Sequence, residues 1–195
     1  MAVILQPCAN KGARQHYEDT IKNTVLLDSI SGFFEDQELI DLQLIYPLRQ
    51  LAIWGVTPSQ ETKWKRIQPG DVTLLAKEGA IFASGVTTYK SHNPALAKYL
   101  WDVNSEGNTW EYIYFLKNIT PLSYTYLEMN QAIGYKSKYN YRGFNVVDSK
   151  RSTQAINRFG LQSVVTPIDF ALTDEDMDFT STETVEGKKV LRYTT

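Results

Sequence analysis

The sequence predicts an α+β fold, organised as a small mixed β-barrel with flanking helices. Between residues 51 and 150, apolar runs of strand length alternate with turn signals, such as Pro-Gly-Asp at 69–71 and Glu-Gly at 78–79. Outside that region, apolar residues recur at helical spacing. The chain has 195 residues, which is enough for one hydrophobic core with appended elements.

Residues 1–50 are expected to form an N-terminal helical extension packed on the core. The stretch AVILQP is typical of a short strand or an extended arm that stops at Pro7. A helix is predicted from about Lys11, with Asn10 placed as its N-cap. Its apolar residues, spaced four apart, are Ala13, Tyr17, Ile21 and Val25. A second short helix is expected around residues 36–42.

Residues 51–150 are expected to form the barrel domain. QLAIWGVT at 50–57 has a buried-strand pattern, and two further strands are expected around the turn at 78–79. NPALAKYLW at 93–101 predicts a short helix with Asn93 at the N-cap and Pro94 at its first position. Strands are expected again in TWEYIYFLKNI at 109–119 and YRGFNVVD at 141–148.

Residues 151–195 are expected to form a separate C-terminal piece. STQAINRFGLQSV at 152–164 has a helical pattern. LTDEDMDFTSTETVEGKK at 172–189 is acidic and poor in apolar residues, which is typical of a loosely ordered tail or linker.

Composition excludes several classes of protein. The net charge of −2 does not indicate a nucleic-acid binder globally, although a local basic face is compatible with it. A single cysteine, Cys8, excludes an internal disulfide, and two distant histidines exclude zinc-finger chemistry. No apolar run reaches the ~20 residues of a membrane span, and the first residues do not resemble a signal peptide. We therefore expect a cytoplasmic protein with no membrane partner.

The sequence lacks the common catalytic motifs. It has no GxxxxGK[ST] loop, no GxGxxG and no GxSxG elbow. Cys8 and His16 are close enough in sequence for a nucleophile pair, but a small buried thiol is the simpler interpretation. We assign no catalytic residue, metal ligand or cofactor, and the chain by itself favours a binding module over an enzyme.

Tryptophans mark the ends of the expected strands and helices. Trp54 closes the first barrel strand, Trp64 precedes the turn at 69–71, Trp101 ends the short helix and Trp110 opens the next strand. Aromatic side chains at the rim of a barrel are suited to enclosing a planar ligand such as a nucleobase. Each tryptophan is equally compatible with core packing.

Two local basic stretches are interleaved with aromatic residues. In GYKSKYNYRGF, Lys136, Lys138 and Arg142 alternate with tyrosines and no acid intervenes. Lys63, Lys65 and Arg66 surround Trp64. Such patterns suit a nucleic-acid backbone with stacking support, and a solvated surface hairpin is the alternative.

The ordered set AIWGVTPSQETKWKRIQPGD, NPALAKYLW, TWEYIYFL and YRGFNVV resembles the EVE domain. This family lies in the PUA-like superfamily, which also holds the YTH readers of methylated bases. The resemblance covers about residues 1–150, because the leading residues are similar to extensions of such modules in modification-dependent restriction enzymes. In those enzymes an EVE-like domain recognises a modified base and a separate domain cuts DNA, often of the HNH type or with a McrB-type motor. It implies a PUA-like/EVE barrel whose aromatic pocket receives a base flipped out of a duplex.

The resemblance also implies site residues. Trp54 would stack on the base, Gly55 would offer backbone groups to the base edge, and Trp101, with Trp110, would form another wall. The polar residues expected to contact the base or its phosphate are Lys90, Ser91 and Asn93; Asn93 is equally suited to capping a helix. The residues expected to contact the nucleic-acid backbone are Lys63, Lys65, Lys136, Lys138 and Arg142.

We therefore expect a specificity module that binds double-stranded DNA with a modified base, in a restriction or phage-defence system that also contains a nuclease domain or subunit. The sequence leaves open whether the mark is 5-methylcytosine, 5-hydroxymethylcytosine or N6-methyladenine. The main alternative is an RNA-binding PUA-like module. An enzyme and a structural adaptor are the remaining hypotheses.

Overall fold

The computed structural model describes residues 1–161, 182–185 and 188–191. The chain divides into two compact units, residues 1–165 and residues 166–195. The first unit holds the main sheet, and the second holds a two-stranded antiparallel ladder of β8 (Thr182–Val185) and β9 (Lys188–Leu191).

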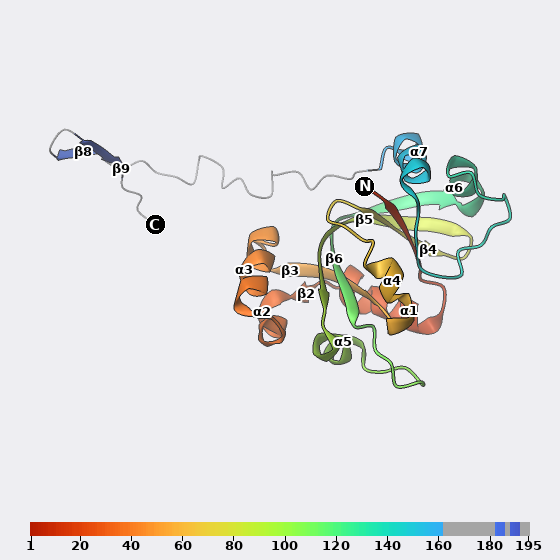
Figure 1. Cartoon of the computed structure of the whole chain (residues 1–195), viewed down its shortest axis with the longest axis horizontal. Coiled ribbons are helices and arrows are strands. Elements are labelled where there is room, and N and C mark those ends of the chain that lie inside the picture. Colours follow the sequence, from red (N-terminus) through yellow and green to blue (C-terminus); the bar gives the residue numbers. More distant parts are fainter. Residues whose placement is uncertain (162–181, 186–187, 192–195) are drawn as a thin grey trace. The chain divides into compact units, whose positions relative to one another are not determined.

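The first unit mixes strands and helices along its whole length (Figure 1). Its elements are, in order, β1 (Val3–Pro7), α1 (Lys11–Tyr17), the short π-helix η1 (Glu18–Lys22), β2 (Val25–Leu26), α2 (Leu27–Ile30), η2 (Ser31–Phe33), α3 (Asp36–Ile45), β3 (Gln50–Val56), η3 (Pro58–Gln60), α4 (Glu61–Trp64), β4 (Val72–Lys77), β5 (Ala80–His92), α5 (Pro94–Trp101), β6 (Tyr112–Thr125), α6 (Tyr126–Ala132), β7 (Asn145–Val146) and α7 (Ser149–Phe159).

A mixed sheet in the order β2-β3-β6-β5-β4-β1-β7 forms the centre of this unit. β1 runs parallel to β4, and every other neighbouring pair is antiparallel. The α+β class and the mixed sheet are confirmed, but the closed barrel is not. Among the described residues the edge strands β2 and β7 do not pair with each other, and at two residues each they are too short to form a closing ladder.

The sheet is nevertheless curved, because β5 and β6 are long and irregular. They span 13 and 14 residues, and their pairing shifts register at several points. Such bulges bend a strand and increase its twist. Residues of six strands, β1 and β3 to β7, therefore meet in one interior cluster, which includes Ile4, Trp54, Leu75, Ala83, Tyr114 and Val146.

Helices cover the outer surfaces of the sheet. Ile53 of β3 and Phe115 of β6 pack in a cluster with residues of α2, α3 and α5. Leu5 of β1 packs in another cluster with Met129 of α6 and Ala155 of α7. Figure 1 shows the two groups of helices on different parts of the sheet. Both faces of the central strands are therefore buried, which explains their nearly continuous apolar sequences.

The N-terminal strand lies inside the sheet rather than outside it. β1 is paired on both sides, with Val3 opposite Val72 of β4 and Ile4 opposite Val146 of β7. The Gly-Asp turn before β4 contributes to this, because the buried carboxylate of Asp71 accepts hydrogen bonds from the backbone N–H of Ala2 and of Gln68. The sheet therefore includes strands from both sides of the domain boundary expected at residue 50.

Several local expectations are confirmed. The Asn10 side chain accepts from Ala13 N at 2.7 Å and caps α1, and the Asn93 side chain accepts from Leu96 N at 2.9 Å and caps α5. The helix expected near residue 36 is α3, and the helical pattern after 150 becomes α7. The acidic stretch 172–189 lies largely outside the described residues.

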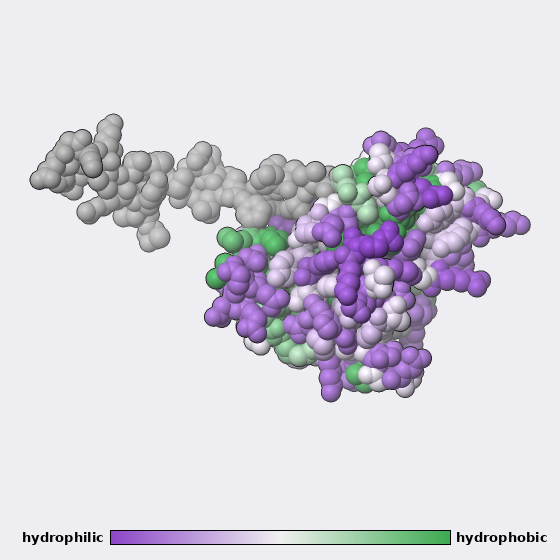
Figure 2. All heavy atoms as spheres, in the orientation of Figure 1, coloured by the Kyte–Doolittle hydropathy of each residue, from purple (hydrophilic) through white to green (hydrophobic). Residues whose placement is uncertain are grey.

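The described part of the chain contains no helix long and apolar enough to cross a membrane. Figure 2 shows one face of the first unit, which is mostly hydrophilic with apolar surface in the region of α3. Ile40 and Leu44 of α3 and Leu48 just after it are exposed.

Candidate functional site

A cavity of about 190 Å³ opens where the end of β3 meets α1. Its walls come from the end of β1, from α1, from residues 54–57 and Gln60, from Trp110 and from residues 142–144. This volume is below the roughly 300–1,000 Å³ of sites for drug-sized ligands. It suits one flat ring better than a larger molecule.

Aromatic side chains form much of this cavity. Trp54, His16 and Trp110 all line it. The His16 ring meets the Trp110 ring edge-on with centroids 4.2 Å apart, and it lies 6.4 Å from the Trp54 ring. Trp54 and His16 are buried, whereas Trp110 is only half-buried. Two of the tryptophans predicted for a pocket therefore share one cavity.

Because Gly55 has no side chain, Trp101 and Trp110, both predicted for the pocket, lie close to the end of β3. A Cβ atom built on Gly55 would lie 2.2 Å from the Trp110 carbonyl oxygen and 2.7 Å from the Trp101 ring. Trp101 does not line the cavity; its ring stacks on the His16 ring, with centroids 5.4 Å apart and planes 29° apart. The structure thus brings together Trp54, Gly55, Trp101 and Trp110, with Trp101 in contact with a lining residue rather than lining the cavity itself.

The three polar residues predicted for base contact are engaged elsewhere in the fold. Lys90 Nζ donates to the carbonyl oxygens of Trp64, Lys65 and Ile67 at 3.3, 3.1 and 2.7 Å. It also lies 4.6 Å from the centre of the Trp64 ring. Burial lowers the pKa of the Lys90 amino group. Lys90 therefore fixes the turn after α4, and it does not line the cavity.

Ser91 and Asn93 have similar internal partners. Ser91 Oγ donates to Glu38 Oε1 at 3.0 Å, and Asn93 Nδ2 donates to the Phe33 carbonyl at 2.6 Å. Neither residue lines the cavity. Since Asn93 also caps α5, both the amide nitrogen and the amide oxygen of its side chain form hydrogen bonds within the protein.

Arg142 is the predicted backbone-contact residue that reaches the cavity. It is exposed, and its guanidinium makes no hydrogen bond or ion pair within residues 1–161. Lys136 and Lys138 are exposed in the same loop. A cation of this kind is available to an external anion.

Lys63 and Lys65 differ from Arg142 in having partners. Lys63 Nζ donates to Gln60 Oε1 at 3.1 Å and to the Phe144 carbonyl at 2.8 Å, and both of these partner residues line the cavity. Lys65 forms an exposed ion pair with Glu61 at 2.6 Å. Lys63 therefore fixes the cavity wall.

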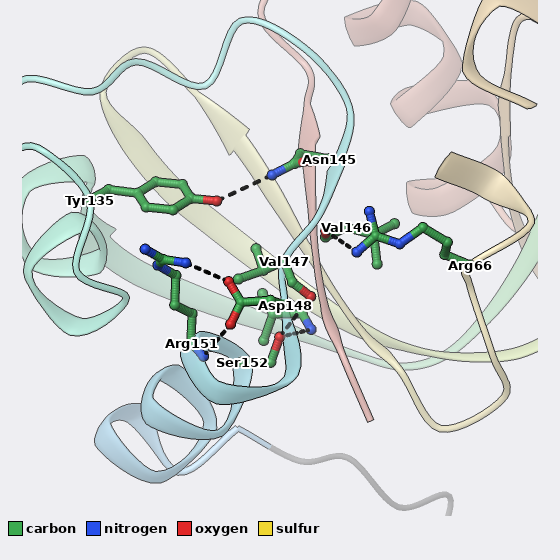
Figure 3. A network of polar contacts seen from close by, with 9 residues as sticks. Arg66, Tyr135, Asn145, Val146, Val147, Asp148, Arg151 and Ser152 are labelled. Carbon is green, nitrogen blue, oxygen red and sulfur yellow. Dashed lines mark hydrogen bonds and ion pairs between the residues drawn. The ribbon is translucent and has the colours of Figure 1, made fainter. Parts of the chain in front are cut away.

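Further hydrogen bonds hold the segment that follows Arg142 (Figure 3). Arg66 Nη2 donates to the Val146 carbonyl at 3.0 Å, and Asn145 Nδ2 donates to the Tyr135 hydroxyl at 3.2 Å. Ser152 Oγ donates to the Val147 carbonyl at 3.2 Å and accepts from Val3 N at 2.9 Å. The cavity wall at 142–144 is thus anchored to β7, to α7 and to the sheet.

A second cavity, of about 390 Å³, lies next to the first. The two share Pro7, Asn10 and Arg142 in their walls. Tyr126 and Tyr141, whose ring centroids are 4.5 Å apart, line the second cavity. The Arg142 side chain therefore borders both spaces.

The Cys8–His16 nucleophile pair is not formed. Cys8 Sγ donates to the Gln6 carbonyl at 3.7 Å, and burial raises the pKa of the thiol to about 12. Burial also lowers the pKa of His16 to about 4, with Asp19 acting weakly in the opposite direction. At neutral pH both groups are uncharged. Among the described residues no cluster of three or more His, Cys, Asp or Glu side chains is placed to hold a metal ion.

Sequence reasoning did not assign His16 to the pocket. It lies one helical turn after Ala13, which also lines the cavity, so both residues occupy the face of α1 that meets β3. A histidine on the inner face of the predicted helix was the available signal. The sequence did not indicate how that helix packs against the sheet.

The fold is similar to a solved structure described as the N-terminal domain of Thermococcus gammatolerans McrB bound to m5C DNA. The TM-score is 0.64 at 16% sequence identity, and the match covers 82% of this chain and 98% of that one. The chain shares the fold of that domain. No family model matches the sequence, and no curated protein matches it.

Proposed function

We propose that this chain binds DNA carrying a modified base, and that the base leaves the duplex to occupy the cavity beside Trp54, Gly55 and Trp110. The observation that carries the proposal is an aromatic cavity of single-ring size, in a fold like that of a domain solved with m5C DNA. Because that likeness is one of fold, the cavity's own chemistry must support the function.

The energetics of the cavity are compatible with this function. Extruding a base costs a few kcal/mol, whereas stacking on aromatic side chains contributes roughly 1–3 kcal/mol per base. A methyl group adds about 25 cal/mol for each Å² of apolar surface that it buries. Trp110 is half-buried, so it has surface left for a ligand ring to cover. A methylated base would therefore gain more from this cavity than an unmodified one.

The charge distribution supports local contact with phosphate. The net charge is −2, so binding cannot depend on an overall positive field. Arg142 borders the cavity with no internal partner among the described residues, and Lys136 and Lys138 are exposed nearby in sequence. We infer that these cations contact the backbone on either side of the extruded base.

The wider proposal is a reader of the EVE type in a restriction or phage-defence system. In such a system a nuclease on another domain or subunit would make the cut. An RNA-binding PUA-like module would use the same cavity and cations, so the experiment must separate the two partners.

The test is fluorescence-polarisation binding at fixed salt to duplexes that differ at one base. The probes carry unmodified cytosine, 5-methylcytosine, 5-hydroxymethylcytosine or N6-methyladenine, with a single-stranded RNA of the same length as competitor. We expect a preference of tenfold or more for one modified duplex, equivalent to about 1.4 kcal/mol. Equal, salt-sensitive binding to all duplexes would refute the modified-base reader, and stronger binding to RNA would favour the alternative.

Trp110→Ala is the variant to compare with the wild type. Trp54 is 3% exposed and belongs to the interior cluster, so Trp54→Ala would be expected to lose about 3–5 kcal/mol of stability along with any binding. Trp110 is half-buried and is a gentler site. Tyr99→Ala, which removes an aromatic ring that is 60% exposed on α5, serves as the control. Selectivity should fall in Trp110→Ala and persist in Tyr99→Ala.

A further inference from the structure

His16 combines burial with a missing hydrogen bond. Its side chain is 7% exposed and lines the aromatic cavity. Its own carbonyl accepts from Thr20 Oγ1, but neither ring nitrogen makes a hydrogen bond to any described residue. Among the described residues, the fully buried side-chain nitrogen and oxygen atoms without a partner are Trp101 Nε1 and Thr109 Oγ1, and the His16 nitrogens are not among them. Since His16 lines the cavity, its unbonded nitrogens are therefore accessible from that space.

The surroundings of His16 supply rings rather than polar partners. Trp110 meets it edge-on at 4.2 Å, Trp101 stacks on it at 5.4 Å, and Trp54 lies at 6.4 Å. These contacts fix the plane of the imidazole from several sides. A ring held in this way presents its nitrogens in a defined direction, which is the condition for reading a ligand by hydrogen bonds.

The protonation state of His16 decides what it can offer. Burial holds its pKa at about 4, so the ring is neutral at physiological pH. A neutral imidazole has one N–H donor and one nitrogen acceptor. The Watson–Crick edge of a nucleobase also presents donors and acceptors side by side, and enzymes that extrude a base read it through that edge.

We propose that His16 reads the polar edge of the extruded base through a hydrogen bond from or to its ring. This inference rests on the proposed function. It assigns different roles to hydrogen bonding and to stacking in the cavity. Stacking on Trp54 or Trp110 depends on area and tolerates any base, because every base has a π-face. His16 is the polar lining group held between the tryptophan rings, and it would help to distinguish one base from another, while the tryptophans would respond to the added methyl group.

The matched variants are His16→Phe and His16→Asn. His16→Phe keeps a flat ring against the tryptophans and removes both nitrogens. His16→Asn restores a donor and an acceptor on a smaller side chain. His92 is the control, because it is exposed, bonds to Glu111 Oε1 at 2.9 Å and stacks on Tyr112, outside the cavity. His92→Phe should bind as the wild type does.

We expect His16→Phe to lose about tenfold in affinity for the preferred modified duplex, and to lose discrimination between cytosine-derived and adenine-derived bases. His16→Asn should recover part of that discrimination. In parallel, ¹⁵N NMR of the wild-type histidine rings should show a shift of the His16 nitrogens when the modified duplex is added, with the His92 signals unchanged. The NMR measurement needs no variant, so it decides the matter even if a substitution unfolds the protein.

The outcomes separate this inference from the proposed function. If the wild type prefers a modified duplex, but His16→Phe keeps the same affinity and selectivity and the His16 nitrogens do not shift, His16 is only an aromatic wall and the inference is overturned. If the wild type shows no preference for any modified duplex, the proposed function fails first, and the inference fails with it.

Discussion

The carbonyl oxygen of Trp110 lies 2.2 Å from the point that a Cβ atom on Gly55 would occupy. No side chain fits there unless the backbone before β6 moves away from the end of β3. The same point is 2.7 Å from the Trp101 ring. Gly55 is therefore the residue that allows the tryptophans to close on the cavity, and its role is steric, since no positive φ is required of it.

Gly55→Ala should destabilise the protein and also disturb the cavity. Overpacking of this kind typically costs about 1–3 kcal/mol, and the displaced Trp110 would lose its position relative to His16. Urea denaturation measures the first effect, and binding to the modified duplex measures the second. The control is Gly32→Ala, because nothing lies within 4 Å of a Cβ at Gly32. If Gly55→Ala is as stable as Gly32→Ala and binds the modified duplex as tightly, the steric role of Gly55 is contradicted.

Gly55 was expected near Trp101 and Trp110 only from the resemblance to the EVE domain, because 46 and 55 residues separate it from them and no local pattern links these positions. The caps Asn10 and Asn93 were predictable from the sequence itself, since capping is a local interaction. These two predictions depend only on neighbours along the chain, and the structure confirms both.

Contacts between distant segments were not predictable. β1 pairs with β4 across roughly seventy residues, and one sequence carries no signal for such a parallel pairing. Lys90 was expected to face a ligand, yet its amino group reaches back to carbonyl oxygens at residues 64–67. Closure of the sheet depended on the length of β2 and β7, which is only two residues each.

Arg142→Ala should weaken DNA binding without affecting stability. The guanidinium borders both cavities and has no partner among the described residues, so its loss breaks no internal contact. A phosphate contact predicts that affinity falls to a similar extent for modified and unmodified duplexes. The slope of log affinity against log salt should decrease in magnitude by about 1.

The control for Arg142 is Arg158→Ala. Arg158 is exposed on α7 and lines neither cavity. Fluorescence polarisation across a salt series should give this variant the wild-type slope. If Arg142→Ala and Arg158→Ala change the slope equally, then Arg142 contributes only general charge and not a phosphate contact.

Cys8 should be unreactive in the folded protein. Its side chain is 1% exposed, and burial raises the pKa of the thiol to about 12, so almost no thiolate exists at neutral pH. Labelling with a thiol-directed maleimide at pH 7.5 should therefore proceed only after denaturant is added. Rapid labelling of the native protein would show that the end of β1 opens readily, and would count against the packing of Cys8 in the interior cluster.

The stability of the protein should fall in acid partly because of His16. The folded state holds the pKa of His16 at about 4, whereas an unfolded chain has a value near 6.5. The unfolded state therefore binds the proton more readily, so this contribution to stability is present above about pH 6.5 and is lost as the pH falls towards 4. The gap between the two values corresponds to about 3 kcal/mol at most.

In denaturant titrations from pH 7.5 to 4.5, His16→Phe should lose less stability than the wild type, whereas His92→Phe should follow the wild type. If His16→Phe and the wild type lose the same amount, the imidazole is not held neutral by burial, and the donor–acceptor reading of the base would lose its basis.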